Sequence, residues 1–273
     1  MRHTYALLLA PLLLAALTLA ACTGPQRTTR PADPGATVVR VATFNLNYGL
    51  AGDEATLDAL GGLDADVVAL QETTPAWEEV IRERFEGKWP HMTFVHSSGA
   101  GGIAVLSRHP LLAEQTIDPP SPPGWFPALR VEVDTPGQPI QVVAVHLRPP
   151  YSDSGSIVVG YFEASDYHDA EIQALTPQLR DDLPTVVLGD FNEGDGGAAI
   201  GWLEARGFEN ALPAFGVDGN TWRWNTSVGE VTSRLDHVVY DRRFVPLDAG
   251  IVAKGRSDHL PVVATLQLGQ AAE

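Results

Sequence analysis

Short apolar runs recur along the chain from residue 38 onward, and they give the first indication of the fold. Each run is rich in Val, Ile and Leu and is bounded by polar or turn-forming residues, which is typical of strands buried within a sheet. The predicted strands cover residues 38–44, 66–70, 101–107, 140–147, 184–189, 235–240 and 260–267.

Segments with a helical pattern lie between these strands. The predicted helices cover residues 53–62, 75–86, 160–182 and 196–206, and Pro75 opens the second of them. Proline is favoured at a first helical position because its fixed φ suits the helix and no backbone donor is needed there. Strands interleaved with helices predict an α/β layered domain.

Two stretches, residues 110–127 and 148–160, are rich in Pro, Gly and Ser. The second of them follows the predicted strand that carries His146. Long irregular connections in a compact domain often have a function. We therefore expect these two stretches to form the walls of a substrate cleft.

The N-terminal segment has the features of an export signal. A basic start precedes an apolar run over residues 6–19, and small residues lead into the sequence LAAC at 19–22. These four residues resemble a bacterial lipobox, which implies cleavage before Cys22 and lipidation of that cysteine. The alternative is an uncleaved membrane anchor, but the run contains Pro11 and is shorter than the roughly 20 residues of a spanning helix.

The rest of the chain divides into three parts. Residues 22–36 have the composition of a flexible tether, residues 37–268 have the length of one large domain, and 269–273 form a short tail. Since Cys22 is the only cysteine, the chain can form no internal disulfide. Two or more acyl chains hold a protein stably at a bilayer, so we expect an extracytoplasmic domain anchored to the cell membrane or the outer membrane.

The charge of the chain limits how it can bind nucleic acid. Its formal net charge is −16, and Lys88 and Lys254 are its only lysines. This argues against a broad basic footprint. A nuclease is not excluded, because bound metal ions can supply the positive charge that a phosphate needs.

Polar residues stand where several predicted strands end. These are Asn45, Glu72, His146, Asp190 and Asn192, and two further polar groups follow at 234–237 and 257–259. If they converge at one end of a sheet, they make an oxygen-rich site. Such a site suits Mg²⁺ or Mn²⁺ better than Zn²⁺, which prefers more Cys and His ligands.

The motifs TFN, QE, HL, GDFN, RLDH and SDHLP occur in this order between residues 38 and 267. Together they resemble the motif set of the endonuclease/exonuclease/phosphatase superfamily. The resemblance implies a DNase-like four-layer α/β/β/α sandwich, with the site at one end of two packed sheets. It also implies metal-dependent hydrolysis of phosphate esters.

The same resemblance implies how the metal is held. Glu72, assisted by Asn45, would bind the principal Mg²⁺ or Mn²⁺ ion, and Asp258 would lie near the metal or the attacking water.

The resemblance further implies roles in catalysis. Asp190 would be the general base or the carboxylate that orients the nucleophile. Asn192 would help to position Asp190 and the phosphate. His146 and His259 would face the phosphoryl oxygens. Asp236 would orient His259, fix its tautomer and favour its charged form.

Three further residues are candidates for substrate binding, each with a structural alternative. Arg130 resembles a phosphate-contacting arginine of the family, and the alternative is a salt bridge. His168 lies in a helical segment after the His146 loop, and the alternative is a purely structural role. Trp224 shares a strand face with Trp222 and is a candidate for the cleft wall, although core packing is the default for such a pair.

Three functions remain open. The first is phosphodiester hydrolysis, with extracellular nucleic acid as a substrate, by a monomer for which no protein partner is inferred. The second is a phosphatase or phospholipase C-like enzyme acting on lipid head groups or sugar phosphates. The third is a noncatalytic binding lipoprotein, which is disfavoured because none of the residues assigned to the site is missing.

Overall fold

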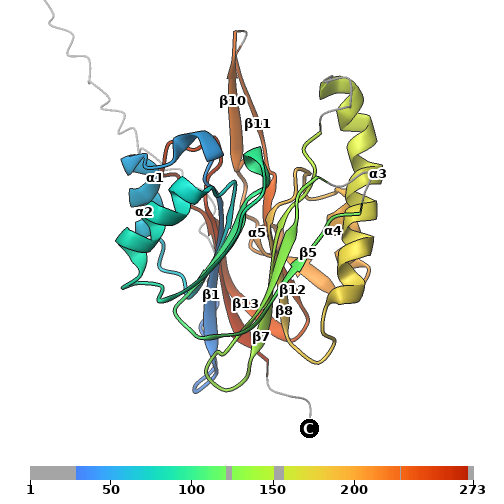
Figure 1. The fold of residues 1–273 in the computed structure, drawn as a ribbon. Coiled ribbons are helices and arrows are strands. Elements are labelled where there is room, and N and C mark those ends of the chain that lie inside the picture. Colours follow the sequence, from blue (N-terminus) through green and yellow to red (C-terminus); the bar gives the residue numbers. More distant parts are fainter. Residues whose placement is uncertain (1–28, 121–124, 151–156, 228, 270–273) are drawn as a thin grey trace, which may run out of the picture.

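Two six-stranded sheets pack face to face between two layers of helices (Figure 1). The computed structural model describes residues 29–120, 125–150, 157–227 and 229–269. The predicted four-layer α/β/β/α sandwich is therefore correct. The predicted export signal, Cys22, the first part of the predicted tether up to residue 28 and residues 270–273 of the tail lie outside the described residues, as do parts of both predicted cleft walls.

The first sheet has the strand order β13-β14-β1-β2-β4-β3. Its strands are β1 (Val38–Asn45), β2 (Val67–Gln71), β3 (His91–Val95), β4 (Ile103–Ser107), β13 (Phe244–Ile251) and β14 (Val262–Leu268). Only β1 and β2 pair in parallel within this sheet, so both point their carboxyl ends toward the same edge. Helices α1 (Glu54–Gly61) and α2 (Pro75–Phe85) cover its outer face (Figure 1).

The second sheet has the order β5-β6-β7-β8-β12-β9. Its strands are β5 (Leu111–Ile117), β6 (Ala128–Val133), β7 (Ile140–His146), β8 (Thr185–Asp190), β9 (Phe208–Asn210) and β12 (Asp236–Asp241). Here β7 and β8 form the parallel pair. Helices α3 (Ile157–Leu175) and α4 (Ala198–Glu204) cover its outer face, while the short α5 (Ala211–Ala214) packs near β12 and β13.

Alternate residues of the central strands enter different cores, which explains their continuous apolar sequences. In β1, Val41 packs between the sheets and Phe44 packs under the helices of the first layer. In β7, Val142 packs between the sheets and Val143 faces the second helical layer. Strands with both faces buried need apolar residues at every position.

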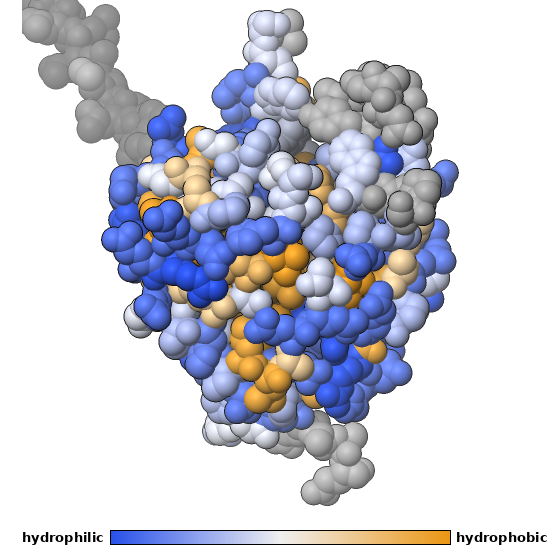
Figure 2. Space-filling view, viewed as in Figure 1, coloured by the Kyte–Doolittle hydropathy of each residue, from blue (hydrophilic) through white to orange (hydrophobic). Residues whose placement is uncertain are grey.

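The helices follow the amphipathic pattern that this packing requires. In α2, Trp77, Ile81 and Phe85 are buried at four-residue spacing, and Thr74 caps the first turn by accepting a hydrogen bond from the Trp77 N–H. The residues between them are largely charged. The surface over α1 and α2, at the left of Figure 2, is accordingly mostly hydrophilic.

A hairpin stands apart from the two sheets. Its strands, β10 (Trp222–Thr226) and β11 (Gly229–Ser233), form a separate two-stranded sheet that projects from one end of the sandwich (Figure 1). The hairpin is tied to the domain because Trp222 forms an isolated bridge with His259.

Several predicted boundaries need correction. Residues 111–117 form strand β5 rather than an irregular wall. This edge strand alternates half-buried and exposed positions, and its exposed polar residues hide the pattern. Helix α3 ends at Leu175 rather than at 182, and the short helix η3 (Thr176–Gln178), which contains Pro177, follows it.

Part of the predicted tether is held on the domain. The backbone N–H of Arg30 donates to Leu247, and Asp33 exchanges hydrogen bonds with the side chain of Gln267. Among the described residues, no helix has the length and apolar character needed to cross a membrane.

Candidate active site

The polar strand ends meet at the end of the sandwich from which the β10–β11 hairpin projects. His146 ends β7 and pairs with Asp190, which ends the parallel strand β8. Strand β12 runs antiparallel to β8, so its first residue, Asp236, also pairs with Asp190. From the other sheet, Asn45 at the end of β1 donates from Nδ2 to the Oδ2 atom of Asp190 at 3.0 Å. The site therefore joins the two sheets.

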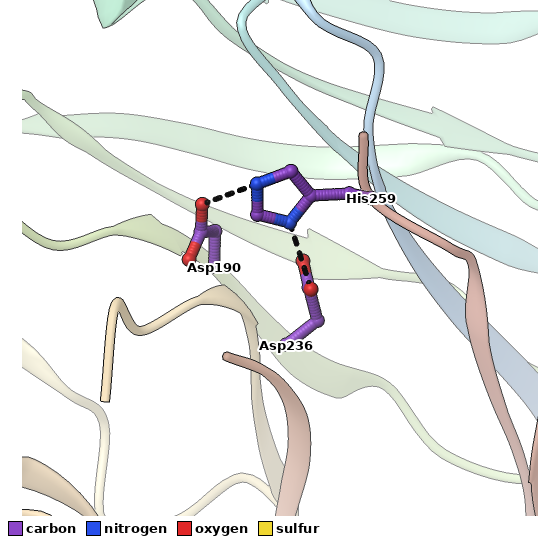
Figure 3. A group of neighbouring side chains, drawn as sticks. All are labelled: Asp190, Asp236 and His259. Carbon is purple, nitrogen blue, oxygen red and sulfur yellow. Dashed lines mark hydrogen bonds and ion pairs between the residues drawn. The ribbon is translucent and has the colours of Figure 1, made fainter. Parts of the chain in front are cut away.

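Asp190 lies at the centre of this arrangement. The Nε2 atoms of His146 and His259 each lie 3.6 Å from its Oδ2. On the far side of the His259 ring, Nδ1 lies 2.9 Å from Oδ2 of Asp236 (Figure 3). These four side chains are almost fully buried. The imidazole of His259 is thus fixed between two carboxylates.

The surroundings give the two histidines opposite protonation tendencies. Burial lowers the pKa of His146, and the Asp190 carboxylate only partly opposes this. Burial also disfavours the charged form of His259, but the carboxylates of Asp236 and Asp190 outweigh it and raise the pKa of that imidazole to about 10. Near neutral pH, His259 is therefore an imidazolium and His146 is neutral.

Glu72 and Asn45 lie on another side of Asp190. Oε1 of Glu72 accepts a hydrogen bond from Asn45 Nδ2 at 3.1 Å, and Oε2 accepts one from the Tyr48 N–H at 3.0 Å. Because the same Asn45 amide also bonds Asp190, the two carboxylates are neighbours. Burial raises the pKa of Glu72, and the nearby charge of Asp190 raises it further.

This donor set fits a hard divalent cation. Two adjacent, largely buried carboxylates, Glu72 and Asp190, offer the oxygen ligands that Mg²⁺ and Mn²⁺ prefer, and a cation would relieve their repulsion. The Asn45 amide bridges them through Nδ2, while its Oδ1 accepts a hydrogen bond from the Asn47 N–H. Asp190, Asp236 and His259 also offer ligand atoms within 4.8 Å of one another. However, His259 and Asp236 are already bonded to each other. The carboxylate oxygens of Glu72 and Asp190 therefore fit a divalent cation better than the bonded pair of Asp236 and His259.

Asp258 lies beside this centre and is bonded to two other residues. Its Oδ1 accepts a hydrogen bond from Asn47 Nδ2 at 2.9 Å, and its Oδ2 accepts one from Trp222 Nε1 at 3.3 Å. Asp258 thereby links the loop after β1 to the base of the β10–β11 hairpin. Its negative charge also contributes to the raised pKa of His259.

Backbone strain is concentrated at this site. Among the described residues, the non-glycine residues with a left-handed φ are Asn47, Glu72 and Asn192, at 62°, 58° and 50°. Such conformations cost roughly 1–3 kcal/mol each and persist where surrounding contacts enforce them. For Asn192, its N–H donates to Asp190 Oδ1 and its side-chain amide donates to the carbonyl of Leu147, both at 2.9 Å.

The three predicted substrate-binding residues lie outside this cluster. Arg130 pairs with Val143, three positions before His146 on β7, and its guanidinium bonds Gln115, Glu132 and Gln141. The structural alternative fits this placement better than a phosphate contact.

The other two candidates differ in exposure. His168 is 1% exposed and lies behind the loops of the site. Trp224 is 45% exposed on the projecting hairpin, with its ring edge-on to that of Trp222 at 6.0 Å between centroids. Trp224 is therefore not part of the core, contrary to the default expectation for such a pair.

Some site residues were not found from the sequence. Phe126 stacks on the His146 ring, with centroids 4.4 Å apart and planes at 29°. No motif marks Phe126, because it lies in a proline-rich stretch. Asn47 lies two residues after the TFN motif and Glu193 directly follows GDFN, and this proximity was a signal that could have identified them.

The sequence profile of the endonuclease/exonuclease/phosphatase family matches residues 42–259, a span that contains the strand-end residues described above. The chain belongs to this family. It is therefore a phosphoesterase that uses a divalent metal ion. No curated protein matches the chain.

Solved structures show the same fold at low sequence identity. An endonuclease/exonuclease/phosphatase protein from Beutenbergia cavernae is 22% identical with a TM-score of 0.66, over 86% of this chain and 72% of that one. The human Nocturnin catalytic domain, with bound sulfate, is 16% identical with a TM-score of 0.65, and the match covers 85% of this chain and 94% of that domain. A Neisseria 3′ phosphatase bound to a product DNA hairpin is 18% identical with a TM-score of 0.63, and the match covers 83% of this chain and 98% of that one.

Proposed function

We propose that this phosphoesterase hydrolyses phosphodiester bonds with Mg²⁺ or Mn²⁺, as an exported enzyme anchored to a membrane through Cys22. The observation that supports the chemistry best is the convergence of His146, His259 and Asn45 on one oxygen of Asp190. A buried carboxylate that accepts a hydrogen bond from Asn45 and has two imidazole nitrogens 3.6 Å away is held in place to activate a water molecule.

Each side chain has a distinct part in the proposed reaction. Asp190 orients the attacking water and accepts its proton. His259, held as an imidazolium by Asp236, donates to a non-bridging phosphoryl oxygen, where negative charge develops. His146, on the other side of Asp190, faces a second phosphoryl oxygen. A metal ion at Glu72 and Asn45 would polarise the phosphoryl group and stabilise the leaving oxygen.

Exposed aromatic side chains near the site favour a substrate with planar groups. Tyr48, Trp125 and Trp224 are 52%, 43% and 45% exposed. Tyr48 bonds Glu72 through its backbone, and Trp125 adjoins the Phe126 that stacks on His146. Bases of nucleic acids stack on such rings without sequence preference. We therefore place single-stranded nucleic acid first among the substrates.

Phosphomonoesters, sugar phosphates and phospholipid head groups are the second candidate, since the fold is shared with a 3′ phosphatase. The test is a comparison of purified protein on DNA, RNA, phospholipid vesicles and phosphosugars, with Mg²⁺ or Mn²⁺ and with excess chelator. We expect cleavage of nucleic acid that the chelator abolishes. Rapid hydrolysis of monoesters with no attack on any diester would overturn the proposal.

A further inference from the structure

A buried histidine on α3 connects the two loops that follow the catalytic strands. Nδ1 of His168 lies 2.9 Å from Oε2 of Glu193, which comes directly after Asn192. On the other side of the ring, Nε2 lies 2.7 Å from the backbone oxygen of Arg148, two residues after His146. One side chain thus bonds both the loop after β7 and the loop after β8.

Glu193 is itself firmly fixed. Its Oε1 accepts a hydrogen bond from the backbone N–H of Ile200 at 2.8 Å, and its backbone oxygen lies 2.9 Å from Nε2 of His237. The chain also passes close to it, since a Cβ at Gly197 would lie 2.1 Å from the Glu193 carboxyl carbon. Because Glu193 has little freedom to move, His168 holds the Arg148 loop against a rigid support.

The two acceptors define the state of the ring. A carboxylate and a carbonyl oxygen only accept hydrogen bonds, so both nitrogens of His168 donate when the ring is an imidazolium. Burial disfavours this charged form, but the hydrogen bond and charge of Glu193 outweigh burial and raise the pKa of His168. Glu171 on the same helix acts in the same direction and accepts a hydrogen bond from the Arg148 N–H at 3.1 Å.

We propose that His168 is a positioning residue, which holds the loop after His146 against the loop that carries Asn192 and so fixes the phosphate-facing side chains. The proposal rests on the phosphoesterase function of the site. A second bond between the same loops, from Asn192 Nδ2 to the Leu147 carbonyl at 2.9 Å, lies next to the contacts of His168. Small displacements of reacting groups can lower a rate about 100-fold, so loosening this link should affect turnover.

The test compares His168→Gln with the wild-type enzyme on bis(p-nitrophenyl) phosphate with Mn²⁺. Glutamine has a similar size, but its amide can donate to only one of the two acceptors. We expect kcat to fall about 10- to 100-fold, with KM changed much less, because the loops that hold the reacting groups are loosened while the cleft is kept. His109→Gln, a histidine in the turn after β4, is the matched control and should keep both constants.

The pH profile separates positioning from a general loss of structure. The raised pKa means that the link is complete at low pH and loses one N–H bond as pH rises through that pKa. The ratio of wild-type to His168→Gln kcat should therefore fall toward one at alkaline pH. A ratio that is constant across pH, with both proteins folded, would overturn the proposal.

Glu193→Gln is a second variant, which keeps the ring and the fold of the loop but removes the charge. It should lower kcat in the same way, and combining it with His168→Gln should add little further loss. Crystal structures of the wild type and of His168→Gln test the role without a substrate. The Arg148 carbonyl should lie farther from Glu193 in the variant than in the wild type. If the wild-type enzyme cleaves no diester, the proposed function fails, whereas unchanged loops in that structure refute the positioning role.

Discussion

Two histidines beside one carboxylate differ in charge because their second partners differ. Burial keeps His146 neutral, and the stacked ring of Phe126 supplies no charge to oppose it. His259 instead has Asp236 on its other nitrogen, which raises its pKa to about 10 despite burial. Acid and base roles in a site commonly follow from such unequal surroundings.

Asp190→Asn should abolish nearly all turnover and leave the fold intact. The amide has the same shape as the carboxylate but cannot accept the proton of the attacking water. We expect kcat to fall about 10³-fold, the usual scale for a lost general base. Steady-state hydrolysis and thermal unfolding measure the two effects, and Asp182→Asn, on the surface, is the matched control. Full activity of Asp190→Asn would place water activation elsewhere.

Glu72→Gln should weaken metal binding rather than remove the chemistry. The change takes away the charge of a buried carboxylate but retains an oxygen that accepts the Tyr48 hydrogen bond. The Mn²⁺ concentration for half-maximal activity should rise, and excess Mn²⁺ should partly restore the rate. Calorimetric titration with Mn²⁺ checks the affinity directly, with the exposed Glu79→Gln as control. An unchanged titration would refute the assignment.

Among the elements, the β10–β11 hairpin is joined to the site at two residues, Asp258 and His259. Its base is fixed, because Trp222 donates to Asp258 and pairs with His259, whereas its outer part is exposed. Trp224 and Val231 are cross-strand partners and are 45% and 51% exposed. Trp224 and Val231 thus stand side by side on the exposed part of a hairpin whose base contacts the active centre, and a long substrate that extended along the hairpin would contact them.

Trp224→Ala should weaken the binding of long substrates only. Stacking on an aromatic ring contributes ~1–3 kcal/mol per base, so KM for a single-stranded oligonucleotide should rise at least about 5-fold. KM for bis(p-nitrophenyl) phosphate, which cannot reach the hairpin, should not change. Val245→Ala, a substitution of similar exposure on β13, is the control. Equal effects on both substrates would show that Trp224 supports the fold rather than the substrate.

At the scale of the whole molecule, the net charge and the proposed lipid anchor bear on how the enzyme meets its substrate. A net charge of −16 gives the chain little long-range attraction for polyanions. Local donors and the metal must therefore hold the phosphate. Attachment through lipid would place the enzyme at a surface without using the domain itself, whose described helices include none that could span a bilayer.

Cys22→Ser should release the protein from the membrane fraction or leave an unprocessed precursor. The serine hydroxyl cannot replace the thiol that receives the lipid. Without the lipid, the signal segment would not be cleaved at the lipobox. Fractionation and mass determination of the mature N-terminus measure this outcome, with Ser97→Ala in the domain as a control. Normal processing and membrane retention of Cys22→Ser would refute the lipobox interpretation.

The sequence alone determined the central strands, the layered fold and the residues at the strand ends. Strands buried on both faces are continuous apolar runs, so Val67–Gln71 and Thr185–Asp190 were visible without a structure. Edge and hairpin strands such as β5 and β10 were harder to find. One face of each strand is exposed to solvent, so its sequence contains polar residues and resembles that of a loop.

Only the tertiary structure decided which polar residues act together. Asp236 lies beside Asp190 because β12 runs antiparallel to β8, and this pairing joins residues far apart in the chain. Arg130 lies away from the phosphate site because its register on β6 places it opposite Val143 rather than His146. His168 faces inward onto two loops rather than outward to substrate. Register and packing between distant segments depend on the whole core, whereas local pattern reports only which residues are buried.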